Sequence, residues 1–402
     1  MALMPVADAY AAVLKDAAAL PEETVALTDA HHRTLARDIA ALRTQPPAAM
    51  SAMDGYAVRA ADAALGARLK VIGEVAAGRP FDQAIAAGQA ARIFTGGVVP
   101  DGADAIVIQE DTTQDGDTVI VNEASTPGKN IRKAGIDFNQ GDVLLPRGAL
   151  LNDRALALAA GMNHPHLPVH RRPRVAILAT GDELVAPGSS LAPGQIIFSN
   201  VFALTALARS EGAETIDLGI ARDTLESTTD GIRRARNSGA DVLVTTGGAS
   251  VGDHDLVQAA LKAEGTDMAF WKIALRPGKP MMHGKLGPMR VLGLPGNPVS
   301  SYICAYLFLV PLIRALSGRT QIDHVFEQAT LGRQLPANDQ RQDYLRARLD
   351  AGGDGLPVAT SVGAQDSSLV ANLAAAQALI VRPPFVPAAP AGSTCTILRL
   401  PN

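Results

Sequence analysis

The chain is poor in cysteine and in aromatic residues, which excludes several classes of protein. Two cysteines, Cys304 and Cys395, occur in 402 residues, and aromatic residues make up 4% of the sequence. The two cysteines lie far apart in sequence and neither has a neighbour at metal-ligand spacing, so we do not expect a disulfide framework. We therefore expect a protein of a reducing compartment, the cytoplasm.

The sequence also lacks a strong charge imbalance and a long apolar run. Basic residues number 36 and acidic residues 40, for a net charge of −4, which gives no reason to expect a nucleic-acid partner. The longest apolar run, "YICAYLFLVPLI" at Tyr302–Ile313, is shorter than a bilayer span and contains Pro311. No basic region precedes an apolar core at the N-terminus, so we expect no signal peptide and no membrane partner.

What is present is enough apolar sequence, 47% of the chain, for several cored domains. Residues 1–44 place Val6, Tyr10, Val13 and Leu14 at helical spacing, and "RALALAAGM" further along is also typical of a helix. Between them, residues 45–137 hold short apolar runs separated by Gly, Pro and Asp. The pattern predicts a helical linker domain, 1–44 with 138–172, interrupted by an inserted β-rich domain, 45–137.

Strands and helices alternate from Arg174 onward. The strand-like runs "RVAILATGDEL", "TIDLGIARD", "DVLVTTGG" and "VLGLPGNPVSS" are separated by helical runs, one of them with Ser199 as its expected N-cap. Such alternation predicts a parallel sheet covered on both faces, over residues 173–321. Short strand-like runs return in 322–402, so the predicted fold class is multidomain: a central parallel α/β domain, an inserted β domain and a C-terminal β domain or barrel.

Polar residues gather where the predicted parallel strands end, which is the edge at which such sheets bind ligands. Asp182 and Glu183 follow the first strand, and Asp223 follows the second. The third is followed by "TTGGASVGDHD", which ends in two carboxylates, and the last by "PGNP". Basic residues come from "WKIALRPGKP": Lys272, expected inside a strand, with Arg276 and Lys279 after it.

This grouping predicts a site for a phosphorylated substrate with a metal ion. Exposed N–H groups at a helix start attract an oxyanion, and nearby carboxylates suit Mg²⁺, which prefers oxygen ligands. The basic residues would neutralise a second anion. No Ser–His–Asp triad or thiol nucleophile is evident in the cluster, which favours metal-assisted or electrostatic catalysis.

Each of these features alone has a purely structural reading. A glycine-rich turn also fits a tight connection, Asp223 fits a helix cap, and Cys304 on an apolar helix fits the core. The grouping of several such features at one sheet edge favours a functional site.

The loop "TTGGASVGDHD" resembles the molybdopterin-binding module of molybdenum-cofactor enzymes. Further stretches extend the resemblance over nearly the whole chain, in order: "SAMDGYAV", "RIFTGGVVPDGADAIVIQED", "KNIRKAGIDF", "TGDEL", "WKIALRPGKP" and "LPGNPVSS". Together they are similar to the molybdopterin molybdenumtransferases, which insert molybdenum and are related to the C-terminal part of gephyrin.

The resemblance implies an elongated homodimer of four-part subunits. It also implies the reaction, in which adenylylated molybdopterin and molybdate give molybdenum cofactor and AMP with a divalent cation, Mg²⁺. One molybdopterin-binding module is visible, so the preceding adenylylation would belong to another protein, a molybdopterin adenylyltransferase.

The family's functional positions carry over residue by residue. The catalytic positions implied are Asp54, Thr95, Asp137, Glu183, Asp223 and Asp255. The substrate-binding positions that the resemblance implies are Lys272, Arg276, Pro295, Pro298, Arg346 and Ser367. The sheet-edge grouping itself adds further expected substrate-binding residues, Gly247, Gly248, Ser250, Lys279, Gly296 and Asn297, and it gives Asp223, Asp253 and Asp255 as the expected metal ligands.

The sequence departs from the family pattern in three places. Arg276 stands where a lysine is common, which keeps the charge but changes its geometry. Ile136 stands where an acidic residue is usual, and "GAQDSS" around Ser367 departs from a His and Gly pattern. Two alternatives stay open: a non-catalytic dimeric pterin-binding scaffold, and a nucleotide hydrolase built on the same module.

Overall fold

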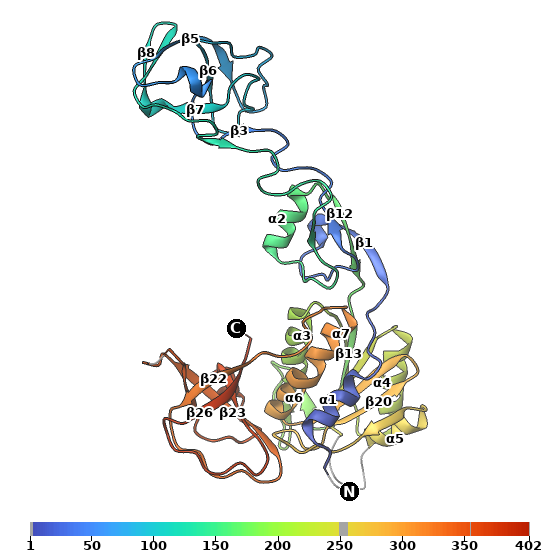
Figure 1. Cartoon of the computed structure of the whole chain (residues 1–402). Coiled ribbons are helices and arrows are strands. Elements are labelled where there is room, and N and C mark those ends of the chain that lie inside the picture. The colour runs from blue at the N-terminus through green and yellow to red at the C-terminus, as the bar shows by residue number, and fades with distance from the viewer. Residues whose placement is uncertain (1–2, 249–255, 354, 402) are drawn as a thin grey trace.

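In the computed structural model, which describes residues 3–248, 256–353 and 355–401, the chain is elongated (Figure 1). A β-rich part lies at one end and an α/β body at the other, with a narrow arm between them and a second β-rich part beside the body. Three six-stranded sheets and separate hydrophobic clusters underlie this division. The predicted multidomain α/β plus β fold class is confirmed.

The central sheet has the order β16-β13-β17-β21-β20-β18. Its strands are β13 (Arg174–Thr180), β16 (Glu214–Ala221), β17 (Val242–Thr246), β18 (Asp267–Phe270), β20 (Met282–Leu286) and β21 (Met289–Leu294). The pairings among β16, β13, β17 and β21 are parallel, but β20 pairs antiparallel with both β21 and β18. The prediction of a fully parallel sheet was therefore wrong at one edge, where a hairpin turn at Gly287 with φ 58° joins β20 to β21.

Helices cover both faces of this sheet because successive side chains of a strand point to opposite sides. Val175 and Ile177 of β13 enter one core, and Ala176 and Leu178 enter the other. The first face is covered by α1 (Val6–Leu14), α3 (Asn200–Ser210), α6 (Pro298–Cys304) and α7 (Val310–Leu316). The second face is covered by α4 (Leu225–Asn237) and α5 (Leu256–Ala263).

The apolar run of the sequence lies in a continuous helix. A π-helical turn at Ala305–Leu309 joins α6 to α7. Among the described residues, Pro298–Leu316 is the one helix long and apolar enough to cross a membrane, and it is 89% buried inside the structure. Its apolar side chains therefore pack in the core, and Cys304 is fully buried there as expected.

The arm corrects the prediction that residues 1–44 are helical. Helix α1 ends at Leu14, and Asp16 then adopts a positive φ of 55°, which a continuing helix does not allow. The arm is built from the strands β1 (Glu22–Ala26), β2 (Ile39–Ala40), β11 (Val143–Leu145) and β12 (His166–His170), with the 3₁₀ turn η1 (Leu27–Asp29) and helix α2 (Asp153–Gly161). Strand β1 pairs with β12 and β2 with β11, so the two chain segments flanking the insertion form one unit.

The insertion is a sheet of order β7-β4-β6-β5-β9-β8. Its elements are β4 (Gly55–Val58), η2 (Ala60–Asp62), β5 (Arg68–Val75), β6 (Gln89–Ile93), β7 (Ala105–Ile108), η3 (Gln109–Asp111), β8 (Thr112–Asp115) and β9 (Thr118–Val121). At its base β3 (Met50–Ser51) pairs with β10 (Ile131–Arg132), where the chain enters and leaves.

The C-terminal sheet has the order β19-β23-β24-β22-β26-β25, and β25 also pairs with β23, which closes it. Its elements are β19 (Leu275–Arg276), β22 (Phe326–Leu331), β23 (Gln342–Asp350), β24 (Val358–Ser361), α8 (Val370–Ala374), β25 (Ala378–Arg382) and β26 (Thr394–Arg399). Strand β19 comes from the α/β part of the sequence but pairs with β23, so it ties the two bodies together.

The direction of β13 decides where the ligand edge of the central sheet lies. Strand β13 begins four residues after β12 of the arm, so its amino end faces the arm and its carboxyl end faces away. Arg171 fixes this junction with two hydrogen bonds to the carboxylate of Asp241, at 2.8 and 3.0 Å. The carboxyl edge of the sheet and the inserted domain therefore lie at opposite ends of one chain (Figure 1).

Candidate functional site

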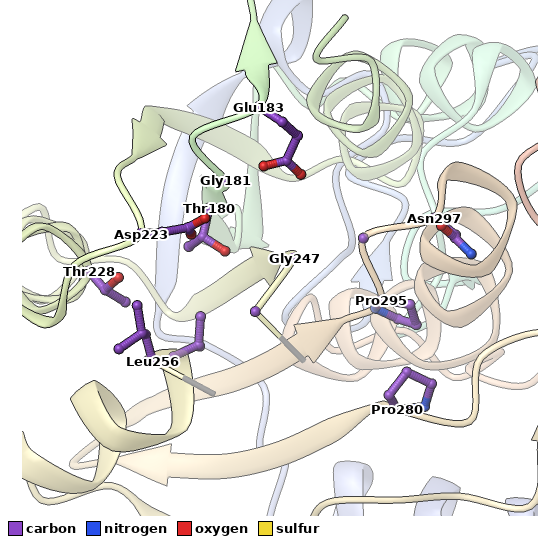
Figure 2. A pocket seen from close by; sticks show the side chains of 13 residues that line it. Thr180, Gly181, Glu183, Asp223, Thr228, Gly247, Leu256, Pro280, Pro295 and Asn297 are labelled. Carbon is purple, nitrogen blue, oxygen red and sulfur yellow. The ribbon is translucent and has the colours of Figure 1, made fainter. Parts of the chain in front are cut away.

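A cavity of about 750 Å³ lies at the carboxyl edge of the central sheet. Its volume is in the range of ordinary ligand pockets. Loops after β13, β16, β17 and β21 form it, together with the start of α5 (Figure 2). Its lining residues are Thr180, Gly181, Glu183, Asp223, Thr228, Gly247, Gly248, Leu256, Val257, Pro280, Pro295, Gly296 and Asn297.

Many of the residues singled out from the sequence meet in this cavity. Figure 2 shows Glu183 and Asp223 on one side and Pro280, Pro295 and Asn297 on the other. The structure thus brings together residues from four separate motifs: Glu183, Asp223, Gly247, Gly248, Pro295, Gly296 and Asn297. Ser250, Asp253 and Asp255 lie outside the described residues.

The turn after β17 needs its two glycines. Gly247 has φ 90° and Gly248 has φ 62°, in the left-handed region that side chains disfavour. A Cβ at Gly247 would lie 2.5 Å from the carbonyl oxygen of Thr180, and one at Gly248 would lie 2.3 Å from Cγ2 of Val257. The two glycines therefore let the backbone after β17 approach Thr180 and Val257 closely at the floor of the cavity.

Thr180 ends β13 and lines the cavity, and sequence reasoning missed it. Its hydroxyl is buried and has no hydrogen-bond partner among the described residues. A buried hydroxyl without a partner is unfavourable, which singles out this strand end among the lining residues. The position directly before "GDEL", at a predicted strand end, was the signal that could have found it.

The acidic side of the cavity is held by two aspartates. The backbone N–H of Asp182 donates to Oδ2 of Asp223 at 3.3 Å, and that of Asp223 donates to Oδ1 of Asp182 at 3.2 Å. These bonds tie the loop after β13 to the loop after β16. The N-cap of α4 is Thr224, whose side chain accepts from the N–H of Ser227, so Asp223 does not serve as that cap.

The basic residues do not line the cavity, contrary to the predicted cluster. Lys272 lies beyond the end of β18 rather than inside a strand, because β18 ends at Phe270. Lys279 is exposed next to Pro280, and neither lysine forms an ion pair within the described ranges. With Glu183 and Asp223 and no described cation, the lining is negatively charged.

Arg276 is engaged by the C-terminal domain. Its Nε and one terminal nitrogen each donate to the carboxylate of Asp343 at 2.7 Å, and Oδ1 of Asn338 accepts at 2.7 Å. The hydrogen bonds to Asp343 raise the pKa of Arg276 above its usual value. In this structure Arg276 therefore joins two domains instead of facing the cavity.

Arg346 and Ser367 lie on the C-terminal domain. The Arg346 side chain is 1% exposed and its guanidinium donates to protein oxygens, so it has no open face toward the cavity. Ser367 meets the cavity wall, since its Oγ accepts a hydrogen bond of 2.7 Å from Nδ2 of Asn297. Pro298 begins α6 just behind that wall.

A second group of predicted residues lies at the base of the inserted domain. The Asp54 carboxylate accepts from both the backbone N–H and the hydroxyl of Thr95, each at 2.7 Å. These bonds lower the pKa of Asp54 below its usual value, the backbone N–H having the larger effect. Asp137 is exposed on the loop after β10, close in sequence to the β3–β10 pairing.

No group of three or more described His, Cys, Asp or Glu residues is arranged to hold a metal ion. Asp223 is described, but its two predicted metal-binding companions are not. The predicted metal site is therefore neither supported nor contradicted.

Comparisons with known proteins agree along the whole chain. Residues 4–162 match the family "MoeA N-terminal region (domain I and II)", residues 176–315 the "Probable molybdopterin binding domain", and residues 328–400 the "MoeA C-terminal region (domain IV)". The cavity's lining lies entirely within the middle match.

Similar proteins match over most of their length. A molybdopterin molybdenumtransferase of Haemophilus influenzae is 38% identical over 379 residues, which is 93% of each chain. One from a Nostoc species is 37% identical over 94% of this chain and 89% of its own. The crystal structure of a molybdopterin biosynthesis MoeA protein from Pyrococcus horikosii aligns with a TM-score of 0.84 at 31% identity, covering 100% of both chains.

Proposed function

The chain belongs to the molybdopterin molybdenumtransferase family, the enzymes of molybdenum cofactor biosynthesis, and we propose how its residues divide that task. It inserts molybdenum from molybdate into adenylylated molybdopterin and releases AMP. The observation that carries this assignment is the cavity at the sheet edge, which lies within the residues matched to a molybdopterin-binding domain.

The cavity's chemistry suits a bound pterin phosphate only if a cation is also present. Glu183 and Asp223 line it, and like charges repel a phosphate group. A divalent cation between the carboxylates and the phosphate removes this repulsion. The charge of the lining therefore supports a requirement for a divalent ion.

Mg²⁺ fits the oxygen donors of the described residues. The carboxylates of Asp223 and Glu183 and the unpartnered hydroxyl of Thr180 are hard donors of the type that Mg²⁺ prefers. Asp223 would hold the ion together with Asp253 and Asp255. When bound, the ion would supply positive charge that stabilises the phosphate oxygens during AMP release.

The remaining roles belong to this chain's own groups. The backbone of Gly247 and Gly248 allows the phosphate to approach closely, and Pro295, Gly296 and Asn297 form the opposite wall. Lys279, exposed beside Pro280, is available to attract molybdate, and Lys272 lies seven residues before it. Arg276 would need to leave Asp343 before it could bind an anion.

Asp54 and Asp137 would contribute to the site through a homodimer. They follow β3 and β10 at the base of the insertion, and the insertion and the α/β body that carries the cavity lie at opposite ends of the molecule (Figure 1). A two-fold partner running in the opposite direction would bring its insertion to this cavity. Exposed apolar side chains of the arm and of the α3 region support such an interface, among them Leu42, Val143, Ile196 and Phe202, which are 52–58% exposed.

The substrate would come from a separate molybdopterin adenylyltransferase. We place both enzymes in the cytoplasm, in keeping with the two free cysteines.

One assay tests the assignment. Purified protein is incubated with adenylylated molybdopterin, Mg²⁺ and molybdate, and AMP and active cofactor are measured. We expect molybdate-dependent AMP release that stops when the divalent ion is removed by chelation. Pterin binding without AMP release would instead identify a scaffold, and AMP release that ignores molybdate would identify a hydrolase.

A further inference from the structure

A loop of the C-terminal domain is fastened to the wall of the α/β cavity. The loop, Val362–Leu369, follows β24 and ends just before α8. Nδ2 of Asn297, a cavity residue, donates to Oγ of Ser367 at 2.7 Å, and the backbone N–H of Val299 donates to the carbonyl of Ser367 at 3.1 Å. One loop residue thus binds the wall at two neighbouring points.

Asn297 uses its side chain for this contact rather than for its own helix. It is the N-cap of α6, where an asparagine side chain usually accepts from the first turn, yet no such bond is present. On the other side of the wall, Nδ2 of Asn200 donates to the carbonyl of Gly296 at 2.8 Å. The wall is therefore held from α3 on one side and from the C-terminal domain on the other.

Gln365 fastens the loop to the barrel. Its Oε1 accepts from the backbone N–H of Arg346 at 3.0 Å, and its Nε2 donates to the carbonyls of Arg346 at 3.1 Å and Val362 at 2.9 Å. A side-chain amide that bonds both the N–H and the carbonyl of one strand residue holds the loop at a fixed position relative to that strand.

Arg346 completes the attachment from below. Its Nε donates to Oε1 of Gln365 at 3.3 Å, and its two terminal nitrogens donate to the carbonyls of Leu369 at 3.2 Å and Asp366 at 2.9 Å. Asp366 and Leu369 flank Ser367, so the buried guanidinium holds the loop on either side of the residue that meets Asn297. If the Arg346 guanidinium only filled the core of the barrel, its N–H groups would not all donate to residues of this loop.

We propose that Gln365, together with Arg346, is a positioning residue that acts through Ser367 on the Asn297 wall and thereby sets the affinity of the cavity for its pterin substrate. This inference rests on the proposed function. The C-terminal domain then completes a cavity whose lining residues all belong to another domain. The Asn297 wall would contact the substrate equally in the bound state and in the transition state. Loss of the loop that supports this wall should therefore raise KM and leave kcat nearly unchanged.

The test is a double-mutant cycle between Gln365→Ala and Ser367→Ala. Each single variant should raise the KM for adenylylated molybdopterin about tenfold, a difference of about 1.4 kcal/mol, with kcat within about twofold of wild type. If both act through one contact, the double variant should be no worse than either single variant. Multiplying effects, near a hundredfold, would overturn the proposal.

Gln377→Ala is the matched control. Gln377 also binds the barrel backbone through its side-chain amide, because its Oε1 accepts from the N–H of Leu349 at 2.9 Å. Among the described residues it forms no side-chain hydrogen bond with the loop Val362–Leu369. It should lower the thermal midpoint as much as Gln365→Ala does, with KM unchanged. An equal rise in KM for the control would mean that general loosening of the barrel, not the loop, is responsible.

Two further measurements keep the outcome decisive. If Gln365→Ala does not fold, Ser367→Ala alone decides, and a KM within about twofold of wild type rejects the positioning role. Binding of molybdopterin alone should weaken in parallel with KM. Should the wild-type protein release no AMP, the proposed reaction fails, while the binding measurement still accepts or rejects the loop's effect.

Discussion

The two acidic groups that the sequence singles out differ in their surroundings. At the sheet edge, the Glu183 carboxylate has no hydrogen bond or ion pair among the described residues, and it faces a cavity. At the base of the insertion, Asp54 already accepts two hydrogen bonds from Thr95. The carboxylate at the sheet edge is free to bind a ligand in the cavity. The carboxylate of Asp54 is already held in place by Thr95, so it could act only on a ligand that another part of the assembly holds.

This difference is what the proposed shared site requires, because such a site would consist of two halves that one chain keeps apart. The arm separates the halves, and the direction of β13 turns the cavity away from the insertion. A single subunit would then hold substrate without the complete set of catalytic groups.

The strongest test mixes two inactive variants. Asp54→Ala and Asp223→Asn homodimers should each lose at least about a hundredfold in AMP release, because each damages both sites of the dimer. Co-expression should restore roughly a quarter of wild-type activity, since half of randomly paired dimers are mixed and each has one intact site. Background activity in mixed dimers that demonstrably form would show that both residues serve the same subunit.

Crowding the floor of the cavity should have the next largest effect. Gly247→Ala places a Cβ 2.5 Å from the carbonyl of Thr180 at a φ of 90°. We expect molybdopterin affinity to fall about 10–100-fold and the free energy of unfolding to fall by about 2–4 kcal/mol.

Gly287→Ala is its control, because Gly287 also has a positive φ, 58°, but nothing lies within 4 Å of an added Cβ. It should lose only about 1 kcal/mol and bind molybdopterin normally, as measured by denaturant unfolding and equilibrium dialysis. Equal binding defects in the two variants would contradict a specific role of the Gly247 turn.

A change at Glu183 should alter the demand for the divalent ion. Glu183→Gln removes one negative charge from the cavity, so the Mg²⁺ concentration for half-maximal AMP release should rise about tenfold. Glu214→Gln, at the start of β16 and hence at the opposite edge of the sheet, should leave it unchanged. A titration in which both variants match wild type would remove Glu183 from the metal site.

The smallest expected effect is a shift in the pKa of Asp54 when its partner Thr95 is changed. The pKa of Asp54 is lowered in the folded state, so its bonds to Thr95 contribute stability above the unfolded pKa, and this is lost as pH falls through the folded pKa. Thr95→Ala removes one of the two bonds, which raises the pKa of Asp54 toward its usual value and moves the acid limb of the activity profile to higher pH.

Thr95→Ser keeps the hydroxyl and should keep the wild-type profile. Carboxylate titration followed by NMR measures the pKa of Asp54 directly. An unshifted Asp54 in Thr95→Ala would leave the backbone N–H as the sole cause of the lowered pKa.

Much of the cavity could be predicted because parallel strands deliver their carboxyl ends to one edge. Glu183, Asp223 and the Gly247 and Pro295 loops meet for that reason alone. Arg276 could not be placed in this way, since β19 leaves the α/β body to pair with β23. The helix expected up to residue 44 failed for a related reason: β1 and β2 are stabilised by distant partners, β12 and β11, which local spacing does not reveal.

By itself, the amino-acid sequence determined the alternation of strands and helices, the glycines of the β17 turn and the family to which the chain belongs. These depend on residues close together, whose side-chain period and backbone freedom are local properties. Only the tertiary structure decided that Arg346 holds a loop and that Ser367 meets Asn297. It also decided that the insertion, which carries Asp54, and the α/β body, which carries Asp223, lie at opposite ends of the molecule. Those relations depend on how separate domains pack, and burial and long-range hydrogen bonds fix that packing only once the whole chain has folded.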